Sequence, residues 1–129
     1  MIEINNLTSR IIDLDSAKAV IEETLKQENK ENNREISVAI ISEKEIREIN
    51  NKYREIDSAT DVLSFEGEED ILGEIIICPE EVQKNGPNFE DELKRVLIHG
   101  TLHLLGYDHE KDQGEMIKKQ EEYFSLIKN

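Results

Sequence analysis

The stretch FEDELKRVLIHGTLHLL, residues 89–105, decides the fold. In its second half, apolar side chains cover nearly the whole circumference of a helix, and a helix that is apolar all round is buried. Gly106 follows directly and is expected to end the helix, because glycine readily adopts the positive φ of a helix C-terminus. The sequence therefore predicts a central helix that other elements cover.

In the part of the chain before this helix, short segments rich in β-branched residues alternate with segments of helical periodicity. A helix is expected to begin at the possible cap Asp15-Ser16, and a second one at the capping box formed by Ser42 and Glu45. Such alternation predicts an α+β sandwich in which a small, mostly parallel four-stranded sheet carries helices on its faces. The expected strands are 1–5, 36–41, 61–65 and 72–78, and the expected helices are 15–25, 43–53, 79–85, 89–105 and 116–127.

Length and composition indicate one domain, over residues 1–129. The single cysteine, Cys78, cannot form an internal disulfide and is expected to be a buried residue at a strand end. No apolar run approaches the roughly 20 residues that span a bilayer. These features exclude a membrane protein and favour a cytoplasmic one.

The net charge of −14, from 16 basic and 30 acidic residues, repels polyanions at long range. This charge argues against nucleic-acid binding. It does not exclude it, because a bound divalent cation and a local basic cluster can reverse the potential inside a cleft.

All three histidines, His99, His103 and His109, lie within eleven consecutive residues. His99 and His103 are one helical turn apart and project from the same face, while Gly106 allows the chain to return so that His109 becomes a third ligand. Three imidazoles leave one tetrahedral position open, as in catalytic zinc sites. The alternative, three satisfied core histidines, is disfavoured because burying them without strong partners is costly. The spacing thus predicts one bound zinc ion at the end of a buried helix.

This histidine spacing matches the metzincin protease signature, with one departure. Metzincins carry a glutamate directly after the first histidine as the general base, whereas this chain has Gly100 there. Glycine cannot abstract a proton, so peptidase activity by that mechanism is not expected.

Arg54 is the second candidate for chemistry, near the end of a predicted helix in Asn51-Lys52-Tyr53-Arg54. A strand at 61–65 could line the same cleft, and a guanidinium donates two parallel hydrogen bonds to a phosphate. Taken alone, this signal is weak, and a solvated surface arginine is the better explanation of the residue.

The two stretches together resemble the YbeY family of bacterial metal-dependent endoribonucleases, in the segment 99–109, the run 51–65, the strand beginning at Leu72-Gly73-Glu74-Ile75 and the helix at Met116. The resemblance covers most of the chain. It implies a zinc site made by the three histidines and an activity as a single-strand-specific endoribonuclease. It further implies a role in 3′-end maturation of small-subunit (16S) ribosomal RNA and in ribosome quality control, with Arg54 as the catalytic, phosphate-contacting residue. RNA is then the substrate, and the ribosome or its proteins are expected partners.

Two positions depart from the family pattern, where proline is common: Ala59 before Thr60, and Glu66 after Phe65. They concern loop rigidity and not the metal. The general base also stays open. Asp61, Asp108 and Glu110 are candidates, but an acid beside a zinc histidine as often orients that histidine, and solvated loop carboxylates are the better explanation of Asp108 and Glu110.

Two other functions fit the residues. One is a zinc hydrolase of a peptide or another small substrate, which would need a base from elsewhere in the fold. The other is a non-enzymatic ribosome-assembly protein with a structural metal, for which Cys78 is the only thiol that could complete the site.

Overall fold

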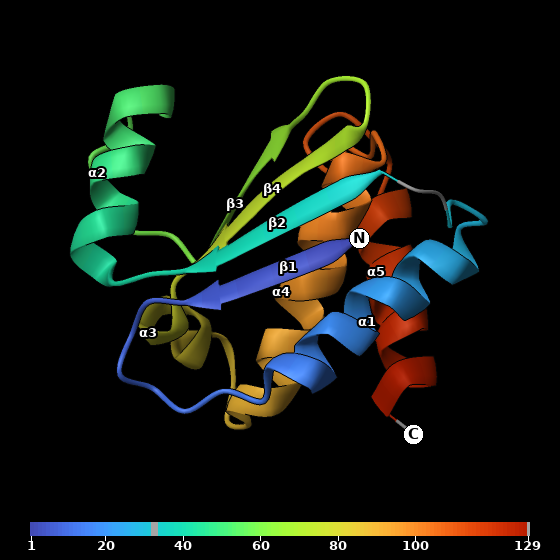
Figure 1. Cartoon of the computed structure of the whole chain (residues 1–129), viewed down its shortest axis with the longest axis horizontal. Coiled ribbons are helices and arrows are strands. Elements are labelled where there is room, and N and C mark those ends of the chain that lie inside the picture. The colour runs from blue at the N-terminus through green and yellow to red at the C-terminus, as the bar shows by residue number, and fades with distance from the viewer. Residues whose placement is uncertain (32–33, 129) are drawn as a thin grey trace.

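The computed structural model describes residues 1–31 and 34–128 and has the predicted α+β architecture. Figure 1 shows one twisted sheet with helices on both of its faces. Within the described residues no helix combines the length and apolarity needed to cross a bilayer. The helices and strands are β1 (Ile2–Asn6), α1 (Leu14–Gln27), β2 (Glu35–Ile40), α2 (Glu43–Arg54), β3 (Val62–Glu66), β4 (Ile71–Ile77), α3 (Pro79–Val82), the 3-10 turn η1 (Gln83–Asn85), α4 (Phe89–Leu104) and α5 (Glu115–Lys128).

The sheet has four strands in the order β1-β2-β4-β3, which the sequence did not determine. β1 with β2 and β2 with β4 pair in parallel, and only β3 runs antiparallel to β4. β3 is an outer strand, so one of its edges is not covered by another strand. The pairing aligns Val38, Ile75 and Ser64 across three strands, so these side chains share one face of the sheet.

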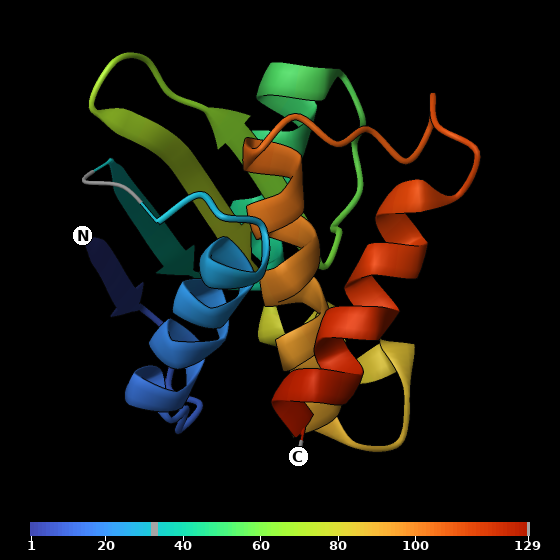
Figure 2. The same ribbon diagram turned by 90° about the vertical axis from the view of Figure 1, so that its right-hand side faces the viewer.

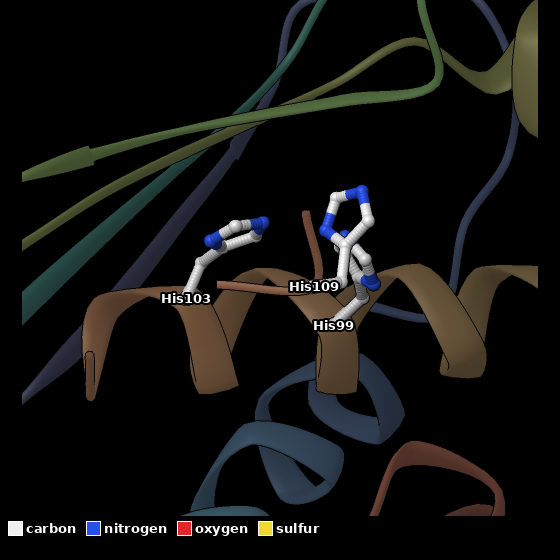
Figure 3. Close-up of side chains that lie close together, drawn as sticks. All are labelled: His99, His103 and His109. Atoms are coloured by element: carbon white, nitrogen blue, oxygen red, sulfur yellow. The ribbon is translucent and has the colours of Figure 1, made fainter. Parts of the chain in front are cut away.

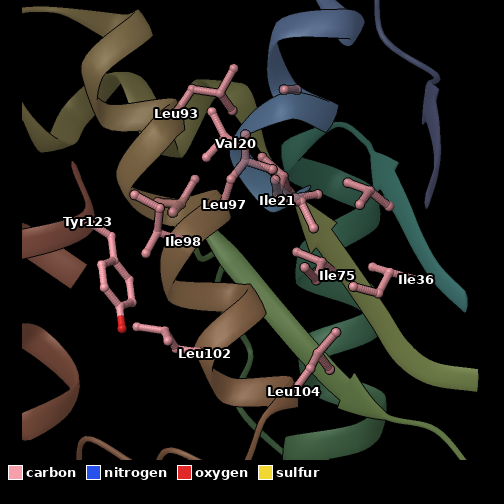
Figure 4. Packing of buried hydrophobic residues seen from close by; sticks show 14 of the residues in the cluster. Val20, Ile21, Ile36, Ile75, Leu93, Leu97, Ile98, Leu102, Leu104 and Tyr123 are labelled. Atoms are coloured by element: carbon pink, nitrogen blue, oxygen red, sulfur yellow. The ribbon is translucent and has the colours of Figure 1, made fainter. Parts of the chain in front are cut away.

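That face is covered by three helices that lie side by side, with α4 between α1 and α5 (Figure 2). The main apolar core fills the space between them and the sheet. Figure 4 shows Leu97 of α4 beside Val20 and Ile21 of α1, with Ile75 of the sheet on the other side. The prediction that 89–105 forms a buried central helix is confirmed, since Ile98 and Leu102 are fully buried.

Among the helices that the structure describes, α2 alone covers the opposite face of the sheet (Figure 1). Ile46 of α2 packs there on Leu63 and Ile76, which alternate along their strands with the residues of the main core. Cys78 belongs to this second cluster and is buried just after β4, as expected.

The helix caps correct two expectations. α1 begins at Leu14, not after Asp15-Ser16, because the Asp13 carboxylate accepts a hydrogen bond from the Ser16 backbone N–H. At α2, Ser42 is the cap: its hydroxyl accepts from the Glu45 N–H at 3.3 Å. The same hydroxyl also donates to the Glu45 carboxylate at 3.0 Å. The glutamate is therefore held by the serine hydroxyl, where the capping-box pattern predicted the serine backbone.

Two large side chains on the outer helices are exposed. Ile117 of α5 is 44% exposed, while Tyr123 takes a buried place on that helix. Tyr53 of α2 is 62% exposed, and Asn50 is buried on that helix instead. Both exposed residues border hollows on the surface.

Candidate metal centre

The three histidines gather at one point beside α4. Figure 3 shows His99 and His103 rising from the same side of the helix, with the ring of His109 beside them. Their ring centroids are 5.0, 5.1 and 5.4 Å apart. One ring nitrogen from each lies within 4.8 Å of the others. Small side-chain rotations bring nitrogens so placed to about 2.0–2.1 Å from one zinc-type ion, so the set could hold a metal.

The end of α4 brings His109 back to the helix. Gly106 has a φ of +104°, and the Tyr107 N–H donates to the Leu102 carbonyl at 3.1 Å. The next turn is closed by Asp108, whose carboxylate accepts from the Glu110 N–H at 3.0 Å. The predicted turn through positive φ is confirmed, and it places the third histidine over the first two.

The electrostatics of the cluster favour the neutral rings that bind metals. Burial lowers the pKa of His99, even though its hydrogen bond to Gln120 opposes the shift. Burial also lowers the pKa of His103, and the neighbouring His109 lowers it further. Burial therefore favours the uncharged form of these two imidazoles.

Gln120 of α5 orients one of the rings, and sequence reasoning did not identify it. Nδ1 of His99 donates to the Gln120 side-chain oxygen across 2.8 Å, which leaves Nε2 with its lone pair free. The sequence gives no signal for this contact, because the residues are 21 positions apart and on different helices. It depends on how α5 packs against α4.

Gly100 has a packing role that explains why no glutamate stands there. A Cβ at this position would lie 2.9 Å from Cγ2 of Ile75 and 3.3 Å from the Ser64 hydroxyl. The Ser64 hydroxyl also donates to the Gly100 carbonyl at 3.3 Å. Position 100 thus faces the sheet where α4 and the strands approach closely, and a long acidic side chain does not fit.

A cleft of about 700 Å³ opens over the histidines, between β3, α4 and the loop after α4. Arg54 lies at its border and is exposed, so the structure brings it to the same cleft as the predicted ligands. No hydrogen bond or ion pair is formed by Arg54 with any residue that the structure describes. The nearby Asp57 pairs instead with Arg47, at 2.8 Å, and that contact lowers the pKa of Asp57.

The three candidate bases also border the cleft. Asp61 accepts from the Asn85 amide at 2.8 Å and lies close enough to His99 to oppose the lowering of its pKa. Asp108 is engaged in the turn described above, and Glu110 is exposed. Of the three, only Asp61 comes from the sheet side of the cleft.

Cys78 is not near the histidines. It lies in the core cluster between the sheet and α2, on the far face from α4, and it does not belong to the group of ligand atoms that the histidines form. Cys78 therefore does not complete the histidine site, as the alternative of a structural metal with a cysteine ligand would require.

Comparisons with known proteins identify the family of the chain. The family described as "Endoribonuclease YbeY" matches residues 3–128. The chain belongs to the endoribonuclease YbeY family. The structure is similar to the solution structure of TM1509 from Thermotoga maritima, with a TM-score of 0.70 and 38% identity, covering 98% of this chain and 89% of that one.

Curated proteins named endoribonuclease YbeY are similar along most of their length. One from Thermotoga maritima is 44% identical over 122 residues, which are 88% of this chain and 80% of the relative. One from Sulfurovum sp. is 38% identical over 135 residues, covering 95% of this chain and 87% of the relative. The resemblance drawn from residues 51–65 and 99–109 is thus confirmed, and in this member of the YbeY family the histidine cluster could hold the metal of an enzyme.

Proposed function

We propose that residues 1–129 act as a single metal-dependent domain that cleaves single-stranded RNA, with one zinc ion held by His99, His103 and His109. The observation that carries this proposal is the convergence of three ring nitrogens within 4.8 Å at the base of a cleft that Arg54 borders. When bound, such an ion supplies Lewis acidity toward a phosphoryl oxygen and toward water.

Arg54 is the residue we assign to the phosphate. Its guanidinium is exposed and has no partner among the described residues, so both of its parallel donors are free for a non-bridging oxygen pair. Charge that develops on the phosphate is then stabilised by a cation already in position.

Asp61 is the best-placed proton acceptor. Its Oδ2 is held by Asn85, which fixes the carboxylate at the cleft opposite α4, while Oδ1 has only a long contact of 3.4 Å from the Thr60 hydroxyl. Oδ1 can therefore take a proton from an attacking nucleophile within the cleft.

The finer assignments rest on the family. We propose that the substrate is ribosomal RNA, in 3′-end maturation of 16S rRNA and in ribosome quality control, and that the enzyme acts in the cytoplasm. A ribosomal partner is consistent with the net charge of −14, which makes unaided association with RNA slow.

The test combines metal analysis with an RNA cleavage assay. His103→Ala is expected to lose most of the metal and the cleavage together. Arg54→Glu is expected to keep the metal and to lose about 100-fold or more in kcat/KM, by analogy with the loss of one transition-state donor. Lys44→Glu is the matched control, since it makes the same charge change on an exposed residue at the other end of α2.

Two results contradict the proposal. Full metal content and full cleavage in His103→Ala would show that the histidines are not the site. Equal losses of kcat/KM in Arg54→Glu and Lys44→Glu would show that Arg54 acts only through the net charge of the protein.

A further inference from the structure

A second hollow, of about 570 Å³, lies on the α2 side of the sheet. It forms where α2 ends and leaves the far part of β3 and β4 uncovered (Figure 1). Tyr53 and Phe65 border it as an edge-to-face pair, with ring centroids 5.6 Å apart and planes at 65°. Tyr53 is 62% exposed, so a large aromatic surface faces solvent here.

This hollow and the histidine cleft are neighbours that share one bordering residue. Phe65 borders both, because it sits at the end of β3, the strand that separates them. Tyr53 is followed in the chain by Arg54, which borders the cleft. An extended polymer that crosses the free edge of β3 therefore meets the aromatic pair and the phosphate-binding arginine as neighbours.

Two cations flank Tyr53, although the chain as a whole is acidic. Lys52 and Arg54 are the basic residues in the last turn of α2, on either side of Tyr53. The Lys52 ammonium lies 5.2 Å from the centre of the Tyr53 ring. Aromatic rings flanked by cations are the usual surface for single-stranded nucleic acid, since bases stack on the rings while the cations meet the backbone.

We propose that Tyr53 and Phe65 form a base-stacking subsite for a nucleotide of single-stranded RNA, next to the phosphate held by Arg54. This inference rests on the proposed function, which it deepens by assigning the contact made to a base.

Two carboxylates in the hollow indicate which bases fit. Glu74 lies directly opposite Phe65 in the β3–β4 pairing, and Glu48 of α2 borders the same space. Carboxylates repel a phosphate but accept hydrogen bonds from the amino group of a base. Cytosine, which carries such an amino group, is therefore expected to bind better than uracil, which carries a carbonyl at the same place.

The experiment measures binding of a 2′-O-methyl oligocytidine, alongside kcat and KM on cleavable RNA, with the metal present. Tyr53→Ala should weaken binding about 5- to 100-fold, the range for loss of one stacked base. KM should rise by a similar factor with kcat unchanged, because stacking holds substrate and transition state equally. Tyr53→Phe keeps the ring and should stay within about twofold of the parent. Ile11→Ala, an exposed apolar residue in a distant loop, is the control and should change nothing.

Two probes show whether a base is what binds. An oligomer of the same length without bases should bind the parent and Tyr53→Ala equally. An oligouridine should bind the parent more weakly than the oligocytidine, and Glu74→Gln should reduce that difference.

The proposal is overturned if the parent does not bind the oligocytidine, or if Tyr53→Ala binds it as the parent does. It is also overturned if Tyr53→Ala weakens the baseless oligomer to the same extent, or if Tyr53→Phe is as poor as Tyr53→Ala. Dimerisation of the protein that Tyr53→Ala abolishes would assign the surface to a second copy of the chain. If the parent binds oligocytidine in a Tyr53-dependent way but does not cleave RNA, the proposed function is wrong and the base-stacking subsite is retained.

Discussion

The side-chain oxygen of Gln120 lies 2.8 Å from Nδ1 of His99 and joins α5 to the histidine cluster. Gln120 in turn donates to Glu121 at 3.1 Å, and Glu121 pairs with Arg95 of α4. The ring of His99 is therefore fixed by a chain of contacts that crosses between the two helices. Its orientation depends on the docking of α5 and not on α4 alone.

Gln120→Ala should weaken metal binding about 10- to 100-fold, the usual cost of removing the partner that orients a metal-binding histidine. Titration of the metal against a competing chelator measures the affinity. Gln120→Glu should retain or increase it, because a carboxylate accepts the same hydrogen bond. Unchanged affinity in Gln120→Ala would mean that the packing of α4 alone holds the ring.

Gly100→Ala should destabilise the protein by about 1–3 kcal/mol, the typical cost of overpacking, because the added methyl group meets Ile75 at 2.9 Å. Urea denaturation measures the change in the free energy of unfolding. In an Ile75→Ala background the same substitution should cost less, since the clashing atoms are gone. Equal costs in both backgrounds would show that the contact does not limit position 100.

Glu28, at the C-terminus of α1, accepts hydrogen bonds from two tyrosine hydroxyls, those of Tyr107 and Tyr123. Burial raises the pKa of Tyr123, and the carboxylate raises it further. The folded protein therefore holds Tyr123 protonated at a pH where the unfolded chain ionises it. The contribution of Tyr123 to the free energy of unfolding is therefore fully present below about pH 10, the pKa of tyrosine in the unfolded chain. It is lost as the pH rises above that value.

Tyr123→Phe should accordingly show a smaller loss of stability between pH 9 and pH 11 than the parent, measured by urea denaturation at each pH. Tyr53→Phe is the matched control, because the Tyr53 ring is largely exposed and lies away from Glu28. Parallel curves for the parent and Tyr123→Phe would contradict the assignment.

RNA affinity should depend only weakly on salt. Arg95, the other basic residue that borders the cleft, is engaged by Glu92 and Glu121, so Arg54 is the principal cation available to a phosphate there. The slope of log affinity against log salt is expected near −1 to −2, and Arg54→Gln should reduce it by roughly 0.7, the value for one phosphate of a single strand. Titrations at several salt concentrations measure it. A steep slope that Arg54→Gln leaves unchanged would place the RNA elsewhere on the surface.

The sequence by itself determined the local features. The β-branched runs predicted the four strands within one or two residues, and the cap at Ser42 was correct because capping depends on neighbours three positions apart. The histidine cluster was predictable for the same reason: a helical turn and one glycine at Gly106 place three residues of an eleven-residue segment together. The cap of α1 was missed because Asp13 and Asp15 are equally good cap residues, and only the packing of Leu14 and Ala17 on the core selects between them.

The tertiary structure alone decided the contacts between distant segments. Strand order placed β3 at the edge of the sheet, and this brought Arg54 and Asp61 to the cleft over α4. The packing of α5 supplied Gln120, and the approach of α4 to Ile75 restricted position 100 to glycine. No periodicity encodes such pairs, because their energies depend on how whole elements bury their apolar faces against one another. The ligands of the proposed metal site were thus predictable from the sequence, whereas the cleft around them exists only in the folded protein.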